Sequence, residues 1–184
     1  LHRFRWLTSW QVAKLLFLGY PSQTGAIRGE EAARKAANER CLRRLKDRQL
    51  VETRQAILPH RHHMMRREYH VLTRAGFLLV RDVLIARGQT PPEWDAARSD
   101  IQPEALAHAL ALNDVAIALA RGCQDRDGQI RAWIDEFVSL SQAGHVHFSG
   151  FRPDAAALVE LNGGQALYFI EVDRGTEPVN SDSA

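Results

Sequence analysis

The charged residues of this 184-residue chain are divided unequally between its two halves. Residues 1–90 contain 18 Lys and Arg against 7 Asp and Glu, a net charge of +11. Residues 91–184 contain 6 against 15, a net charge of −9, so the overall charge of +2 hides the division. Such an asymmetry predicts two modules, of which the basic one suits a polyanion such as nucleic acid. The alternative is a pair of solvated surfaces that merely differ in sign.

The boundary between the two modules is visible as a short break. The run Gly88-Gln89-Thr90-Pro91-Pro92-Glu93 is rich in Pro and polar residues, which interrupt regular structure. We therefore expect a basic domain over residues 1–87, a linker over 88–102 and an acidic domain over 103–184.

Composition excludes several other classes of protein. No segment approaches the roughly 20 apolar residues of a membrane-spanning helix. The two cysteines, Cys41 and Cys123, have no metal-binding or redox spacing and cannot form a disulfide framework. We expect a cytoplasmic protein that makes no contact with a membrane.

The order of elements expected in the basic half is typical of a winged helix-turn-helix domain. One helix starts at Thr8 or Ser9 and reaches about Leu18, and a second covers residues 30–48. Strands at 50–54 and 67–72 enclose a long basic tip at 58–66, and Thr73 caps a further helix to about Ala86. In such domains the second helix enters the major groove, while the hairpin contacts the DNA backbone or the minor groove.

The second helix has a candidate DNA-facing side. Its predicted core stripe is the Arg34 stem, Asn38, Cys41, Leu42 and Leu45, and the opposite side carries Lys35, Ala36, Glu39, Arg40, Arg43 and Lys46. Asn38, although counted in the core stripe, stays among the candidate contacts. The candidate DNA-binding residues are Lys35, Asn38, Glu39, Arg40 and Arg43 on the helix, and Arg54, Arg61, Arg66 and Arg67 on the hairpin.

Four histidines, at positions 60, 62, 63 and 70, also allow a metal site in this region. A zinc site normally pairs His and Cys at set spacings, and no cysteine lies nearby. Arg61, Arg66 and Arg67 would repel a cation, so a basic DNA-facing hairpin is the favoured interpretation.

The acidic half predicts a small α/β domain. A helix over Pro103–Arg121 precedes three strand-like runs at residues 129–140, 152–161 and 165–173, and Asn162-Gly163-Gly164 predicts a hairpin turn. Glu136, Asp154, Glu171 and Asp173 lie within these strands or at their ends. Converging carboxylates bind Mg²⁺, which prefers oxygen ligands. The favoured alternative is that these acids end strands, pair with arginines or face water.

Several motifs together resemble the replication-relaxation family of plasmids and other mobile elements. The resemblance covers nearly the whole chain and lies in residues 6–17, 40–51, 69–76, 108–115 and 152–155, with the run Glu171-Val172-Asp173-Arg174-Gly175-Thr176-Glu177 as its most specific signal. It implies a DNA-binding protein that serves plasmid replication or the relaxation of supercoiled DNA for conjugative transfer.

The resemblance further implies a second domain similar to restriction endonucleases, incomplete at its C-terminal end. Pro153-Asp154 matches the first part of the nuclease motif and Glu171 its second acid, whereas Asp173 replaces the usual Lys. Because that Lys handles the attacking water and the phosphate charge, we expect a degenerate domain without hydrolytic activity. Mg²⁺ or Mn²⁺, held by Asp154 and Glu171, would be the cofactor of an active site.

The sequence therefore predicts a DNA-binding accessory or regulatory protein of a plasmid or integrative element, acting in replication, relaxation or mobilisation. Its expected partners are double-stranded DNA, a second copy of the chain, and a relaxase or replication initiator. Two alternatives remain: a Mg²⁺-dependent nickase that uses Glu136, Asp154, Glu171 and Asp173, and an adaptor that docks a relaxase or dimerises through the acidic domain.

Overall fold

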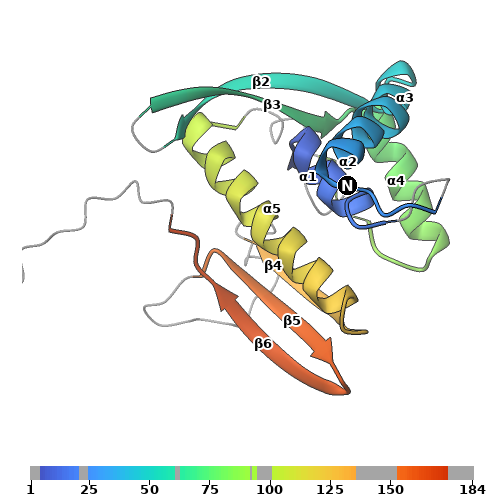
Figure 1. Ribbon diagram of the computed structural model, residues 1–184, viewed down its shortest axis with the longest axis vertical. Helices are drawn as coiled ribbons and strands as arrows, with labels where there is room; N and C mark the ends of the chain where they lie inside the picture. Colours follow the sequence, from blue (N-terminus) through green and yellow to red (C-terminus); the bar gives the residue numbers. More distant parts are fainter. Residues whose placement is uncertain are drawn as a thin grey trace, which may run out of the picture. The chain divides into compact units, whose positions relative to one another are not determined.

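The structure is a computed structural model that describes residues 5–20, 25–60, 63–91, 93–94, 101–135 and 153–173. The chain divides into two compact units, residues 1–113 and residues 114–184, and each is described by itself. Each unit combines helix with a three-stranded antiparallel sheet, so the protein is mixed α+β, as the sequence predicted (Figure 1).

The first unit contains one sheet and several short helices. Its elements are β1 (Trp6–Leu7), α1 (Ser9–Leu16), α2 (Glu30–Ala36), the π-helical segment η1 (Ala37–Leu42), α3 (Arg43–Asp47), β2 (Val51–His60), β3 (His63–Leu72), α4 (Arg74–Ala86) and the first part of α5 (Pro103–Gln124). The strands are ordered β1-β3-β2. Strand β1 was not expected from the sequence, because two residues are too short to show the alternation of a strand.

Two threonines fix the helix starts that the sequence predicted. The Thr8 hydroxyl accepts the backbone N–H of Gln11, whose side-chain oxygen accepts the N–H of Thr8 in return, which completes a capping box for α1. Thr73 accepts the N–H of Gly76 at the start of α4 and donates its hydroxyl to the Gln49 carbonyl. Both predicted caps are confirmed.

Gly76 lets α4 approach the start of β2 closely. A Cβ atom at this position would lie 2.0 Å from the Leu50 carbonyl oxygen, a backbone atom that cannot move aside cheaply. Any side chain here would therefore push α4 away from the sheet. On α4 itself Phe77 and Leu84 are buried, whereas Leu78 and Ile85 are exposed.

The predicted hairpin is present but is much longer than expected. Strands β2 and β3 form one continuous antiparallel ribbon from the Val51–Leu72 pair to the His60–His63 pair. Residues 58–60 and 63–66, assigned by the sequence to a long tip, are thus strand residues. Cross-strand pairing overrides the unfavourable local signals of Pro59 and the histidines, and Pro59 is tolerated because β2 is an edge strand.

The first part of α5 packs within the first unit. The buried Gln11 side chain donates to the Leu110 carbonyl at 2.6 Å, and the Asn113 side chain donates to the Trp6 carbonyl at 2.6 Å. The sequence placed the domain boundary in a linker at residues 88–102, whereas the compact units meet at Asn113 within α5. The exact domain limits stay a prediction.

Helix α5 resembles a membrane-spanning segment in its length and composition. Its 22 residues are long and apolar enough to cross a bilayer by length and composition, contrary to the sequence expectation that no segment comes close. Core helices of soluble proteins can have the same length and composition. Leu106, Leu110 and Ile117 are buried, so at least one side of α5 packs within the protein.

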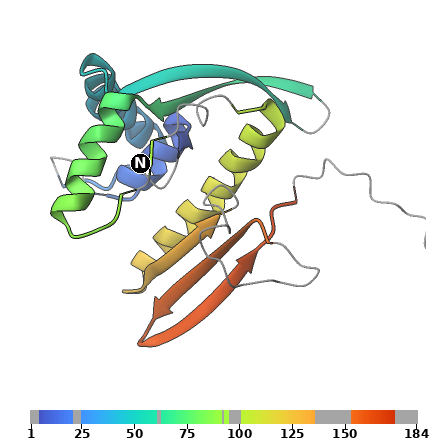
Figure 2. The ribbon, with the colours of Figure 1, turned by 180° about the vertical axis from the view of Figure 1, so that it is seen from behind.

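The second unit consists of the rest of α5 and a sheet ordered β4-β5-β6, visible from behind in Figure 2. The strands are β4 (Gln129–Asp135), β5 (Ala155–Leu161) and β6 (Gly164–Ile170), in the predicted antiparallel meander. The predicted turn between β5 and β6 is confirmed, because Asn162 and Gly163 both have the positive φ angles of a tight hairpin turn.

One face of the second sheet forms a small core. Ala157 and Val159 of β5 pack with Cys123 of α5, and partly buried Leu119, Ile130, Trp133 and Ile170 surround them. Alternation along β5 then directs Ala156, Leu158 and Glu160 to the opposite face. Helix α5 thus covers one face of the sheet, while Ala156, Leu158 and Glu160 of β5 lie on the other face.

Candidate nucleic-acid interface

The helical segment α2–η1–α3 carries the candidate DNA-binding side chains of the first unit. Five of the predicted contacts on this segment are exposed: Lys35, Asn38, Glu39, Arg40 and Arg43. Among the residues that the structure describes, no acidic side chain forms an ion pair with Lys35, Arg40 or Arg43. Three cations therefore stand on one short stretch of helix, together with the exposed Glu39, and none of them is held in a described ion pair.

The buried side of this segment differs from the predicted core stripe. Ala33, Ala36, Ala37 and Leu42 are buried, whereas Arg34 and Asn38 are exposed. The assignment of Ala36 to the DNA-facing side and of Asn38 to the core was wrong. The π-helical turn at η1 explains the error. Its wider spacing rotates the residues before the turn relative to those after it, so a regular 3.6-residue repeat cannot align both.

Arg34 instead joins α2 to α1. Its guanidinium lies 4.4 Å from the centre of the Trp10 ring, and the Lys14 ammonium lies 5.4 Å from the same ring. Cation–π contacts of this kind contribute about 0.5–1 kcal/mol at exposed sites. These two cations therefore have a structural role beside the candidate DNA-facing residues.

The predicted phosphate-binding arginines of the ribbon have different surroundings. Arg54 donates to the Glu52 carboxylate at 2.7 Å, so its charge is partly neutralised. Arg66 donates to the Gln55 side chain, whose amide group in turn donates to Glu68 at 2.9 Å. Arg67 is exposed and Arg61 lies outside the described residues. Arg66 and Arg67 are the better placed of the described candidates for a polyanion.

His70 ties the ribbon to α1. Its two ring nitrogens lie 2.9 Å from the Ser9 hydroxyl and 3.0 Å from the Thr53 hydroxyl, and the residue is 3% exposed. Burial, and secondarily the positive charge of Lys46, lowers the pKa of His70 to about 4, while Glu68 opposes the shift. The imidazole is thus neutral and structural, which the sequence did not reveal.

The predicted metal site in the second unit is only partly described. Asp154 accepts the backbone N–H of Val172 at 2.6 Å, which brings its carboxylate beside the chain between Glu171 and Asp173. Glu171 and Asp173 are exposed, and Glu136 lies outside the described residues. Within the described ranges no group of three or more His, Cys, Asp or Glu side chains is arranged to hold a metal ion. The four-carboxylate hypothesis therefore stays a prediction.

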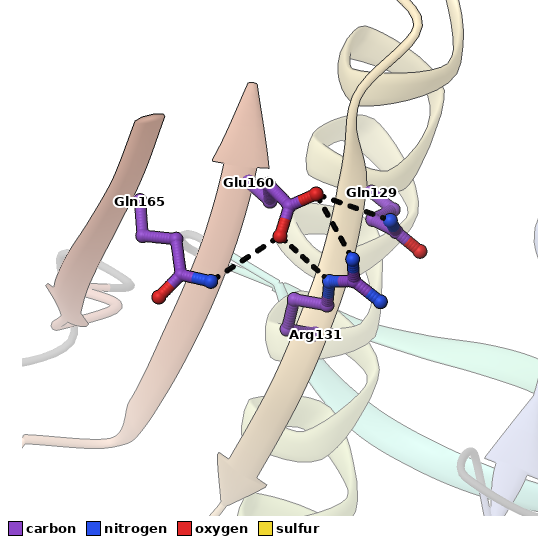
Figure 3. Close-up of polar contacts among 4 residues, drawn as sticks. All are labelled: Gln129, Arg131, Glu160 and Gln165. Carbon is purple, nitrogen blue, oxygen red and sulfur yellow. Dashed lines mark hydrogen bonds and ion pairs between the residues drawn. The ribbon is translucent and has the colours of Figure 1, made fainter. Parts of the chain in front are cut away.

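The most extensive polar network of the second sheet surrounds Glu160 instead. Figure 3 shows Arg131 of β4 donating two hydrogen bonds to this carboxylate, at 2.8 and 2.9 Å, with Gln165 of β6 donating a third at 3.2 Å and Gln129 a fourth at 3.5 Å. The hydrogen bonds from Arg131 are the main reason that the pKa of Glu160 falls to about 2. Arg131 lies at a register shift of β4, where a bulge redirects a side chain.

The fold and these side chains define a mixed α+β protein with an exposed basic helix and a long β-ribbon in its first unit. The chain belongs to the replication-relaxation family, whose model matches residues 1–182. This match confirms the family resemblance and associates the chain with replication or relaxation of plasmid and mobile-element DNA. No curated protein and no solved structure matched the chain.

Proposed function

We propose that the protein binds duplex DNA as an accessory or regulatory factor in the replication, relaxation or mobilisation of a plasmid or integrative element. In this proposal the first unit is a winged helix-turn-helix domain, α2–η1–α3 is its recognition helix and the β2–β3 ribbon is its wing. The strand order β1-β3-β2 and the placement of helices α1 to α4 support this assignment.

The observation that carries the proposal is the exposed cationic face of Lys35, Arg40 and Arg43 within a half of net charge +11. An unneutralised cluster of cations is costly to bring together unless a polyanion is near. Each phosphate that such a cluster neutralises releases counterions, which drives binding at low salt. Arginine can also bond both acceptors of a guanine edge in the major groove.

Salt-dependent binding tests the proposal. We expect wild-type protein to bind a fluorescent duplex with an affinity that falls steeply as salt rises. The double variant Arg40→Ala/Arg43→Ala should lower the slope of log K against log salt by about 1.8, since each lost phosphate contact removes about 0.9.

The matched control is Arg81→Ala/Arg87→Ala, which removes two exposed cations from α4 and its C-terminal end. This control should change the slope and the affinity much less. Equal losses in both double variants would mean that net charge alone attracts DNA and that the recognition helix is misplaced.

A second candidate function, that of an adaptor, rests on the uncovered face of the second sheet. Strand pairing aligns Ile134, Ala156 and Phe169 in one row and Leu158 with Leu167 in the next, on the face opposite α5. Leu167 is 58% and Phe169 44% exposed, an unusual density of apolar side chains at a surface. We propose this face as the contact for a second copy of the chain or for a relaxase.

Oligomeric state tests the adaptor function. The change Leu167→Asp should convert a dimer into a monomer in light scattering, while Glu160→Gln on the polar end of the same face should leave the mass unchanged. If the wild-type protein is a monomer, this face does not bind a second copy. The remaining form of the proposal is then a different partner, such as a relaxase, which co-purification tests.

The nickase alternative has its own test, conversion of supercoiled plasmid to open circles with millimolar Mg²⁺ or Mn²⁺. We expect no conversion, because Asp173 stands where a phosphate-handling Lys is usual in nucleases of this type. Nicking that Asp154→Asn abolishes would establish an enzyme and overturn this expectation.

A further inference from the structure

The far end of the β2–β3 ribbon is chemically different from its base. Alternation and pairing place Thr53, Gln55, Ile57 and Pro59 on one face, together with their partners His70, Glu68, Arg66 and Met64. At the base this face is joined to α1, because the buried His70 lies within hydrogen-bond distance of both Thr53 and Ser9. At the far end the same face is open.

The open end carries apolar side chains. Ile57 is 60% and Met64 59% exposed, and Pro59 is paired directly with Met64. The opposite face of the ribbon is buried at Leu58 and Tyr69. Leu58 and Tyr69 therefore pack within the unit, while the other face presents Ile57 and Met64 to solvent with the half-buried Pro59 between them. Ile, Met and Pro are side-chain types that proteins insert between DNA base pairs.

Polar groups surround this apolar end. Arg66 pairs with Ile57 across the strands, and Gln55 holds the Arg66 side chain through a hydrogen bond while donating to Glu68. Arg67 is exposed on the same strand but belongs to the opposite face, so Arg66 is the described cation beside the apolar end. An apolar tip with an adjacent arginine matches the minor groove, which has a floor of base edges and walls of phosphate. A purely apolar protein partner would gain nothing from Arg66.

The ribbon is long enough for this contact. Its face extends over six residue steps from Thr53 to Pro59, about 20 Å at about 3.3 Å per step. A major groove and the adjacent minor groove lie about half a helical turn, or about 17 Å, apart on the same side of the duplex. A helix in the major groove and the end of this ribbon can thus contact neighbouring grooves.

We propose that the far end of the ribbon enters the minor groove and that Ile57, Pro59 and Met64 wedge between base pairs, which kinks the duplex. This inference rests on the proposed DNA binding and adds its mode. Partial unstacking costs free energy that is lowest at flexible pyrimidine–purine steps. The protein therefore selects deformable sequences at a position where it makes no base-specific hydrogen bond.

Two measurements on the full chain test the wedge. One is energy transfer between dyes at the two ends of a 30-base-pair duplex, which reports bending. The other is the fluorescence of 2-aminopurine placed beside a central TA step, which rises when the base unstacks. Wild-type protein should increase both signals.

The variant Ile57→Ser/Met64→Ser should bind the duplex within about threefold of wild type at low salt, because its cations are intact, but should lose both signals. The matched control Leu79→Ser/Val83→Ser alters two exposed apolar residues of α4 and should keep them. Circular dichroism verifies that both variants are folded.

The outcomes separate this inference from the proposed function. Failure of the wild-type protein to bind any duplex overturns the DNA-binding function itself. Binding without bending, or bending that survives in Ile57→Ser/Met64→Ser, overturns only the wedge. A change of molecular mass in that variant with bending retained would show that the ribbon end contacts a second copy of the chain instead.

Discussion

In each unit one polar side chain forms hydrogen bonds to neighbouring elements: His70 in the first unit and Glu160 in the second. Both pKa values are lowered, to about 4 and about 2, but for different reasons. Burial disfavours the charged form of His70, whereas hydrogen bonds from Arg131 and the glutamines favour the charged form of Glu160. The same direction of shift thus marks a neutral buried group in one unit and an ionised surface group in the other.

The two units also differ in whether their charged surface groups are bonded to a partner. The second unit neutralises Glu160 with Arg131 and satisfies Asp154 with the Val172 N–H. The first unit instead hydrogen-bonds its buried His70 and Gln11 side chains and leaves Lys35, Arg40 and Arg43 on the surface. Compensated charge on a surface is typical of structural roles, and uncompensated charge is typical of a binding site.

The largest effect should come from His70→Ala. Losing a buried side chain and leaving the Ser9 and Thr53 hydroxyls without their partner should lower the free energy of unfolding by about 2–4 kcal/mol. Urea unfolding followed by the fluorescence of Trp6, Trp10 and Trp94, in a Trp133→Phe background, measures the first unit. If His70→Ala lowered the free energy of unfolding no more than Glu160→Ala does, the contrast between buried and exposed hydrogen-bond networks would be wrong.

A slightly smaller effect should come from pH. Because the folded pKa of His70 lies below its ordinary value of 6.5, its stabilising contribution is complete above pH 6.5 and is lost as pH falls towards 4. The expected loss between pH 7.5 and pH 5 is about 2 kcal/mol. His70→Gln, which cannot titrate, should remove this dependence, and an unchanged pH profile in that variant would show that another group is responsible.

Gln11→Ala should have a more moderate effect. It removes both the capping-box bond to the Thr8 N–H and the buried bond to the Leu110 carbonyl, which should cost about 1–3 kcal/mol. Thr8→Ala serves as a control, since it removes the cap of α1 but retains the bond to α5. Equal losses in the two variants would mean that the contact between Gln11 and α5 contributes little to the first unit.

The smallest effect should come from Glu160→Gln. Its interactions with Arg131 and two glutamines lie at the surface, where solvent screens ion pairs, so the unfolding midpoint at pH 7 should stay unchanged within error. The low pKa of Glu160 sets only the direction of this small contribution, which is present above about pH 4.5 and is lost as pH falls towards 2. A clear loss of stability at pH 7 would show that exposed networks in this protein resemble buried ones.

The sequence alone determined much of the local structure, because caps and turns depend on adjacent residues. Thr8, Thr73 and Asn162-Gly163 predicted their helix starts and their hairpin correctly. The family motifs predicted the family, which the match over residues 1–182 confirms. Exposure of Lys35, Arg40 and Arg43 was also predicted from helical periodicity.

Features that depend on contacts between distant residues were decided only by the tertiary structure. The π-helical turn moved Ala36 inside and Asn38 outside, and strand pairing extended the ribbon through residues that look like a loop. The roles of His70, Glu160 and Gln11 also arise from partners 17 to 99 positions away. Periodicity describes one element at a time, whereas burial and hydrogen bonding depend on which elements meet, and only the folded chain specifies that.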